Sequence, residues 1–285
     1  MCRVGPGGPH LTGGPLMRDE MRTSRNRVQS VERALSILQA FTEDDPSLGI
    51  SELSRRTRLS KPVVFRIMQT MTDRGFIEQD PETAEYRIGL RAFEVGALYY
   101  SHMTLEQQAI KAMREMEAKQ GYNVYLAVLD GRHVVYLAAV DSRGPIQVRV
   151  TVGSRSYAHT TAGGKVLLAY LPADQAHELL TAAPLEALTP KTITSVPRLE
   201  RQLAEIRQRG VAINTGETFL DTGSVAAPIR DRSGKVVAAV SNGYPLYSVS
   251  QADLPRLMSE VVGCADAISR QLGAKLPERE VEFGR

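Results

Sequence analysis

The stretch GISELSRRTRLSKPVVFRIMQTMTDRGFI, residues 49–77, constrains the fold more than any other part of the chain. Two short helical patterns are joined there by a tight break, and six basic residues lie between Arg55 and Arg74. Helices this short are not stable alone in water, so each must pack against neighbouring elements. The pattern therefore predicts a small helical domain with a strongly basic face.

The neighbouring segments supply a third helix and a β-hairpin. Before the pair, SVERALSILQAF places Val31, Ala34, Leu35 and Leu38 at the spacing of one buried helix face, with Ser30 as the expected N-cap. After the pair, the strand-like runs FIEQ and EYRIG flank the polar turn DPETA. Three helices followed by a hairpin predict a winged helix-turn-helix, which lays its second HTH helix in the major groove of DNA.

The second helix of the pair carries the chemistry that DNA binding requires. Its apolar stripe of Val64, Ile67, Met68 and Met71 faces inward, so its basic and polar side chains face outward. Cationic side chains neutralise phosphates and read base edges, apolar ones touch thymine methyl groups, and an open helix start binds phosphate. The residues that we expect to contact DNA are Arg55, Arg56, Ser60, Lys61, Pro62, Val63, Phe65, Arg66 and Gln69.

A different interpretation is that these charges form a solvated helix face in an enzyme or an assembly domain. The whole chain carries a net charge of only +3, so the argument for DNA depends on where the charge lies. The short helices, the tight break and the hairpin that follows at once favour DNA binding.

Composition bounds the remaining possibilities. A length of 285 residues suggests two domains, and 42% hydrophobic residues suffice for their cores. Cys2 and Cys264 cannot build a disulfide framework or a thiolate metal cluster. No apolar run is long enough to span a membrane and residues 1–27, rich in Gly and Pro, hold no signal-peptide core, so we expect a disordered tail on a soluble cytoplasmic protein.

The rest of the chain reads as helices around strands. Residues 90–101 and 104–120 are expected to be helical. The runs NVYLAVL, HVVYLAAV, IQVRVTV, VAIN, SVAAPIRD and KVVAAVSNG are strand-like, and TTAGGKVLLAYL, RLERQLAEIRQRG and DLPRLMSEVVGCADAISRQLGA are helical. Successive strands with helices between the groups predict an antiparallel α+β domain.

The glycine-rich segment TTAGGK invites comparison with a nucleotide-binding P-loop. The template fails, because His159 stands where its first glycine belongs and Val166 stands where Ser or Thr should follow Lys165. A helix that starts near Thr161 with small residues still leaves backbone N–H groups open to a carboxylate. The sequence shows no nucleophile elbow, HExxH motif or clustered metal ligands, so we expect neither catalysis nor a cofactor.

Several motifs of the chain resemble those of a known protein family. VQSVERALSILQAF, GISELSRRTRLSKPVVFRIMQTMTDRGFIE and YRIG resemble the N-terminal domain of the IclR family of bacterial transcription regulators. That family's effector-binding domain is resembled, with the motifs in the same order, by HTTAGGKVLLAYLP, RGVAINTGE and VAAPIRDRSGKVVAAVS. The match covers residues from about 28 to 273. The resemblance implies dimers or tetramers that bind palindromic double-stranded operators and respond to small organic acids, as repressors or activators.

The resemblance also implies an effector site. Its residues would be His159, Thr161, Ala162, Gly163, Asn214, Ser224 and Ser241. Some relatives carry Asp and Cys where this chain has Asn214 and Ser224, and many have Gly where it has Arg58 in the HTH turn and Tyr244 near the pocket. His159 has a second interpretation as a structural histidine, which is the commoner role of a lone histidine.

The resulting expectation is an α+β protein with a GAF- or profilin-like antiparallel sheet in its C-terminal domain. Residues 28–88 would form the winged helix, 89–120 linker and dimerisation helices, and 121–275 the effector-binding domain, between tails at 1–27 and 276–285. The alternative is a small-molecule-binding GAF-like protein whose N-terminal helices mediate assembly and do not bind DNA.

Overall fold

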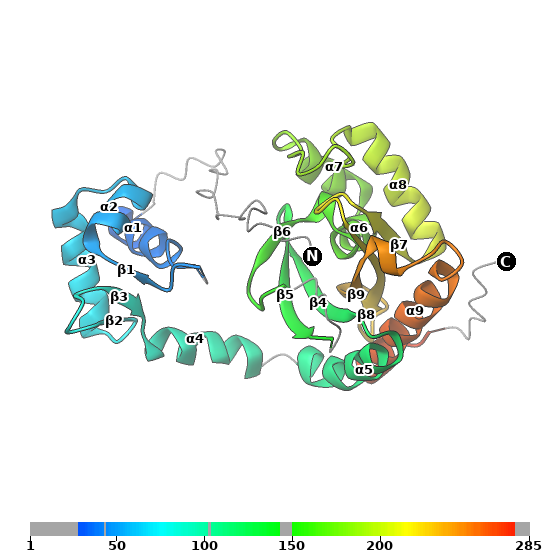
Figure 1. The fold of residues 1–285 in the computed structure, drawn as a ribbon, viewed down its shortest axis with the longest axis horizontal. Coiled ribbons are helices and arrows are strands. Elements are labelled where there is room, and N and C mark those ends of the chain that lie inside the picture. The colour runs from blue at the N-terminus through cyan, green and yellow to red at the C-terminus, as the bar shows by residue number, and fades with distance from the viewer. Residues whose placement is uncertain (1–27, 43, 102–103, 143–149, 277–285) are drawn as a thin grey trace, which may run out of the picture. The chain divides into compact units, whose positions relative to one another are not determined.

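The computed structural model describes residues 28–42, 44–101, 104–142 and 150–276. The expected N-terminal tail and all but the first residue of the expected C-terminal tail lie outside these ranges. The chain divides into two compact units, residues 1–102 and 103–285, and each is described by itself (Figure 1).

The first unit is a winged helix-turn-helix. Its elements are α1 (Gln29–Leu38), β1 (Ser47–Leu48), α2 (Ile50–Thr57), α3 (Lys61–Asp73), β2 (Ile77–Gln79), β3 (Tyr86–Ile88) and α4 (Leu90–Ser101). The three short strands form an antiparallel sheet in the order β1-β3-β2, and β2 and β3 make the wing (Figure 1). The two HTH helices and the hairpin are therefore confirmed, whereas β1 was not expected.

The core of this unit confirms the predicted stripe of α3 and corrects that of α1. Val64, Met68 and Met71 are buried against α1, α2 and the wing. In α1, Ala34 and Leu38 pack against this core as expected, but Val31 and Leu35 are each 53% exposed and Ile37 is fully buried instead. A face built on Ile37 has the same helical period as one built on Val31, and periodicity alone cannot choose between them.

The HTH turn depends on a strained residue. Arg58 ends α2 in the left-handed conformation, with φ 57° and ψ 26°. The Ser54 hydroxyl donates to the carbonyl of Leu59 across this turn, at 2.6 Å. A left-handed residue with a side chain costs about 1–2 kcal/mol, so the rest of the turn must hold Arg58 in place.

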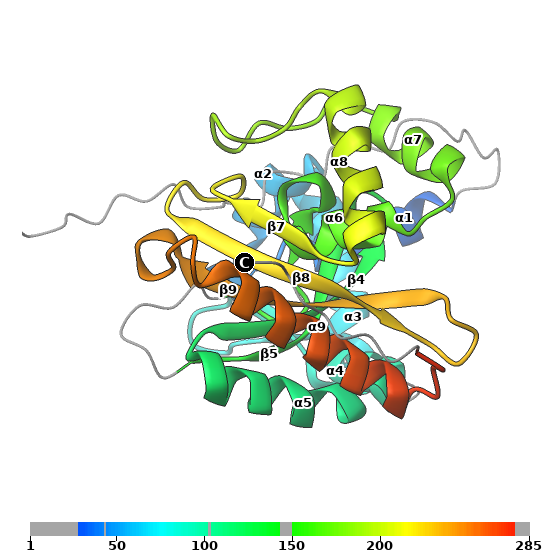
Figure 2. The ribbon, with the colours of Figure 1, turned by 90° about the vertical axis from the view of Figure 1, so that its right-hand side faces the viewer.

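The second unit is built on a six-stranded antiparallel sheet in the order β6-β5-β4-β9-β8-β7. The strands are β4 (Asn123–Asp130), β5 (His133–Val140), β6 (Arg155–Tyr157), β7 (Ala212–Thr215), β8 (Thr222–Arg230) and β9 (Val236–Pro245). Helices α5 (Thr104–Gln120) and α9 (Leu254–Gln271) lie side by side on one face (Figure 2). The other face carries the 3₁₀ turn η1 (Ala158–Thr160) and helices α6 (Ala162–Ala169), α7 (Ala173–Thr181) and α8 (Val196–Arg209); a second 3₁₀ turn, η2 (Leu246–Ser248), follows β9.

Each sheet face buries its own apolar core. Leu126, Val240 and Val261 belong to the cluster under α5 and α9, and Tyr125 and Ala239 belong to the cluster under α6 and α8. Neighbouring residues of a strand enter opposite cores because side chains alternate across a sheet. The predicted antiparallel α+β architecture is confirmed.

Two local expectations were wrong. The predicted strand at 146–152 lies partly outside the described residues, and Val150–Val152 is not a strand; the edge strand is β6, at Arg155–Tyr157. The N-cap of α1 is Val28 and not Ser30, which lies inside the helix. Helix α6 begins at Ala162, directly after Thr161, as expected, and it includes its glycines. A Cβ at Gly164 would overlap the backbone of Ala158, so this glycine serves close packing against η1 and does not delay the helix.

None of the described helices combines the length and the apolar character that a membrane span requires.

We predict that Arg58→Gly raises the free energy of unfolding of the first unit by about 1 kcal/mol, because glycine adopts the left-handed conformation without a Cβ penalty. Denaturant unfolding of the full chain, followed by circular dichroism, measures the change. The matched control is Arg74→Gly, which removes the same charge at the end of α3, where φ is −94° and glycine gains nothing. Equal effects of the two substitutions would contradict the explanation.

Candidate DNA-binding and effector sites

The outward face of α3 presents the predicted DNA-contacting side chains. Lys61, Phe65 and Arg66 are exposed, as are Pro62 and Gln69. Phe65 is 50% exposed, so its ring is accessible to a partner. Among the described residues neither Lys61 nor Arg66 has a side-chain hydrogen bond or ion pair. Their charges are therefore available to DNA.

The start of α3 is open to a phosphate. Ser60 caps the helix with extended backbone, and its carbonyl accepts from the N–H groups of Val63 at 2.9 Å and Val64 at 3.0 Å. Its hydroxyl makes no capping hydrogen bond, so both the hydroxyl and the N–H of Lys61 remain open. An open helix start of this kind attracts anions.

The two arginines of α2 are occupied inside the unit to different extents. Arg56 is held by Glu52 at 2.7 Å, by Asp45 at 2.7 Å and by the carbonyl of Ala40 at 3.1 Å. Its guanidinium ties α2 to the segment after α1, so we withdraw it from the DNA-contacting set. Arg55 also pairs with Glu52 but stays 73% exposed, and it can exchange this partner for a phosphate. The two arginines lower the pKa of Glu52 to about 2.

The wing tip is acidic. Asp80 accepts hydrogen bonds from the N–H groups of Glu82 and Thr83, which lower its pKa, and Glu78 pairs with Arg87 at 3.0 Å. Because carboxylates repel phosphates, we expect α3 and not the wing tip to supply most of the affinity for DNA.

The effector residues predicted on the second unit converge at the start of α6. Thr161 caps the helix by accepting from the N–H of Gly164 at 3.0 Å, and the N–H groups of Ala162 and Gly163 have no acceptor among the described residues. A Cβ at Gly163 would stand 3.8 Å from Ala239 Cβ and 4.0 Å from Ser241 Oγ. The open helix start and the sheet residue Ser241 therefore belong to one site.

Asn214 lies in this region but is already engaged. Its amide donates to the carbonyl of Thr160 and accepts from the N–H of Glu217, the latter at 3.1 Å. Thr218 donates to the same Thr160 carbonyl at 2.7 Å. Asn214 therefore fixes the loop after β7 to η1, whereas the hydroxyls of Ser224 and Ser241 have no partner among the described residues.

A buried ion pair lies beside this loop. The side chain of Lys165 has no exposed surface, and its ammonium group pairs with Glu217, whose side chain is 8% exposed. Burial lowers the pKa of Lys165, and the charge of Glu217 opposes the shift. A lysine enclosed in this way cannot reach a phosphate, which agrees with the failed P-loop template.

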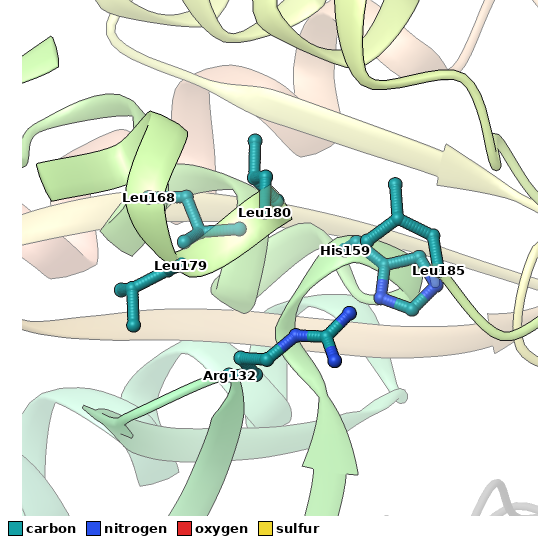
Figure 3. A pocket seen from close by; sticks show the side chains of 6 residues that line it. All are labelled: Arg132, His159, Leu168, Leu179, Leu180 and Leu185. Atoms are coloured by element: carbon teal, nitrogen blue, oxygen red, sulfur yellow. The ribbon is translucent and has the colours of Figure 1, made fainter. Parts of the chain in front are cut away.

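His159 does not join the other predicted effector residues. Its Nε2 lies 2.9 Å from the carbonyl of Glu186, and its ring lines a small cavity with Arg132 and four leucines (Figure 3). The cavity holds about 10 Å³, which is room for roughly one water molecule. Burial lowers the pKa of His159. We therefore correct the effector assignment in favour of the structural interpretation, in which His159 anchors the segment between α7 and α8.

Sequence reasoning missed two features of this region. The Lys165–Glu217 pair joins residues that lie far apart in the chain, and no spacing rule connects them. Tyr125, a buried residue of β4, was read only as part of a strand, although it lies directly opposite Ser241. Within the described ranges no three His, Cys, Asp or Glu side chains are grouped as metal ligands.

Comparison with known proteins identifies both units. Residues 30–81 match the model of the IclR helix-turn-helix domain, and residues 97–270 match the C-terminal domain of the bacterial transcriptional regulator IclR. The chain is 32% identical to the HTH-type transcriptional regulator XynR of Escherichia coli over 246 residues, which cover 86% of this chain and 98% of XynR. It is also 32% identical to a glycerol operon regulatory protein of Streptomyces coelicolor, covering 87% of this chain and 97% of that protein.

Solved structures give the same result. A transcriptional regulator from Rhodococcus sp. RHA1 superposes with a TM-score of 0.75 at 30% identity, covering 86% of this chain and 98% of the other. An IclR homologue from Microbacterium hydrocarbonoxydans, solved in complex with 4-hydroxybenzoate, has a TM-score of 0.76 at 25% identity, covering 85% of this chain and 98% of the other.

A winged helix joined to a domain that binds a small molecule defines a DNA-binding transcription regulator. The chain belongs to the IclR family of such regulators. This family consists of regulators and not of enzymes, and its helix-turn-helix overturns the alternative of an N-terminal unit made for assembly alone.

We predict that Lys165→Met lowers the free energy of unfolding by about 3–5 kcal/mol, because it leaves the Glu217 carboxylate buried without its partner. The double variant Lys165→Met/Glu217→Leu should recover most of that loss, since apolar side chains of similar volume replace both charges. Denaturant unfolding measures both. The control is Arg256→Ala, which breaks the far less buried Arg256–Glu260 pair, with side chains 53% and 23% exposed, and should cost less than about 1 kcal/mol. A similar small cost for Lys165→Met would contradict the role of the buried pair.

Proposed function

We propose that this regulator binds a palindromic operator in double-stranded DNA as a dimer or tetramer, and that a small organic acid bound in the second unit controls that binding. The observation that carries the proposal is the outward face of α3, where Lys61 and Arg66 are exposed and unpaired within the described residues. In this proposal residues 28–88 bind DNA, 89–120 link and dimerise, and 121–275 bind the effector.

Two copies of α3 in a dimer would enter the major groove at half-sites about 34 Å apart or at a multiple of this distance. The neutralised phosphates would set the affinity through counterion release, and the side chains of Lys61, Phe65, Arg66 and Gln69 would read base edges and thymine methyl groups. Ser60 and the N–H of Lys61 would hold a phosphate at the helix start.

The apolar side chains of two helices support self-association. In α4, Leu90, Phe93, Val95 and Leu98 are between 52% and 71% exposed. Val31 and Leu35 of α1 add to the exposed apolar surface of this unit, because no other part of the unit packs over them. Exposed apolar groups of this size mark an interaction surface, and a second copy of the chain is the partner that a palindromic operator implies.

The effector proposal is supported by the open N–H groups of Ala162 and Gly163 above Ser224 and Ser241. Helix starts favour carboxylates, and hydroxyl groups bind them as donors. The relative solved with 4-hydroxybenzoate and the relative that regulates a glycerol operon support an organic acid and a catabolic operon. Binding can change operator affinity only by as much as the acid prefers one geometry of the oligomer over another.

We predict that Arg66→Ala weakens operator binding by about tenfold or more, the loss of one good base contact of about 1–3 kcal/mol. Gel-shift titration on operator DNA selected from a random pool measures the affinity at two salt concentrations. The parent affinity should fall steeply with salt. Arg256→Ala, which removes an equal charge from α9, is the control and should leave binding nearly unchanged. Affinity that is indifferent to both salt and Arg66→Ala would refute the α3 interface.

We also predict that at least one organic acid raises the melting temperature of the parent chain and that Gly163→Ala abolishes this rise. The added methyl fits the fold at van der Waals distance, and alanine favours helix, so the unliganded variant should melt no lower than the parent. It would nevertheless fill the space between the helix start and Ser241. Gly263→Ala in α9, where a Cβ meets open space, is the control and should keep the response. An unchanged response in Gly163→Ala would remove the effector site from this position.

A further inference from the structure

Three hydroxyl groups lie on the sheet face beneath the start of α6. Tyr125 of β4 stands directly opposite Ser241 of β9, and Ser241 stands opposite Ala226 of β8. Ser224 precedes Ala226 by two residues and therefore shares its face. Tyr125, Ala226 and Ala239 belong to the core cluster that packs against α6, so the three hydroxyl-bearing residues face the same helix.

None of these hydroxyls is satisfied by the described part of the chain. Ser224 and Ser241 have no side-chain hydrogen bond there, and the oxygen of Tyr125 is buried and makes no hydrogen bond of regular geometry, although the Asn123 side chain lies close enough to lower its pKa. Tyr125 as a whole is only 4% exposed. A buried hydroxyl without a partner destabilises a fold, so its presence at a binding site indicates that a ligand supplies the missing hydrogen bond.

The Tyr125 hydroxyl lies in a buried position beside Asn123. Burial raises the pKa of the phenol, and the Asn123 side chain lowers it by a smaller amount, which locates the hydroxyl end of the ring near Asn123. The residue opposite Asn123 on β9 is Gly243, which has no side chain. The ring itself is held edge-on against Tyr136 at 5.8 Å between centroids, so its direction is fixed.

The helix start above these groups supplies the complementary chemistry. The free N–H groups of Ala162 and Gly163 suit a carboxylate, and the only side chain that approaches Gly163 from β9 besides Ala239 is Ser241. The nearby charges Lys165 and Glu217 neutralise each other. The rest of the ligand, apart from its carboxylate, can therefore hydrogen-bond only with the three hydroxyl groups of the sheet face. Tyr125 carries the most deeply buried of these.

We infer that Tyr125 is a specificity-determining contact of the effector site, and that the effector is a carboxylic acid that also carries a hydroxyl group. This inference rests on the proposed function, because it assumes that an acid binds at the start of α6. The ligand hydroxyl pairs with the Tyr125 hydroxyl, while the carboxylate lies on the N–H groups of α6. A site built to pair a hydroxyl discriminates strongly against the analogue that lacks it, because the protein group is then left unsatisfied.

The test compares acids that differ by their hydroxyl groups: 4-hydroxybenzoate with benzoate, 3-hydroxybutyrate with butyrate, and gluconate with hexanoate. Isothermal titration calorimetry on the full parent chain should show, for at least one pair, about tenfold tighter binding of the hydroxylated acid. Tyr125→Phe should weaken that acid alone and remove the preference. Tyr136→Phe is the matched control: it makes the same change in the adjacent ring, whose hydroxyl faces Ser156, and it should keep the preference.

The possible failures are distinguishable. If no acid binds the parent chain, the proposed effector function fails, and this inference fails with it. If acids bind but hydroxylated and plain members bind alike, or if Tyr125→Phe keeps the preference, only this inference is overturned. The unliganded Tyr125→Phe chain should melt no lower than the parent, because it loses an unsatisfied group. A clearly lower melting temperature would also contradict the inference, since it would show that the hydroxyl supports the fold.

Discussion

The second unit depends on how closely the start of α6 approaches its surroundings. Gly164 lets the helix pack directly on the backbone of Ala158, and Gly163 leaves a space about one methyl group deep between the helix and the sheet. Behind this contact the buried pair of Lys165 and Glu217 fixes the loop after β7 to the same helix. The arrangement holds the two open N–H groups over the sheet in one position, which is what a preorganised anion site requires.

The first unit divides its positive charge between two tasks. The guanidinium of Arg56 is used up by acidic and carbonyl partners within the unit, so it stabilises the helix pair. Lys61 and Arg66, in the next helix, are left without partners among the described residues. The six basic residues, which look alike in the sequence, therefore do not all have the same role. A basic side chain that is held by partners inside its own unit is not free to neutralise a phosphate and so releases no counterion from DNA.

Both sites carry local costs that the fold offsets elsewhere. Arg58 adopts a left-handed conformation to close the HTH turn, and Tyr125 keeps a buried hydroxyl without a partner. Such departures from local preference persist where surrounding packing over-determines the structure, and they gather at functional sites. The buried stripe of α3 and the two-sided core of the large sheet supply that packing.

The sequence by itself determined the class of this protein. The periodicity of α3, the helical run of α8 and the strand-like runs of β4, β8 and β9 are local signals, and the motifs around them identified the family. Only the tertiary structure decided which face of α1 is buried, that Arg56 and Asn214 are engaged inside the protein, and that His159 contacts the segment between α7 and α8. It also brought together Lys165 with Glu217 and Tyr125 with Ser241. The physical reason is that hydrogen bonds, ion pairs and burial depend on distances in space, and a linear pattern specifies these only between residues a few positions apart.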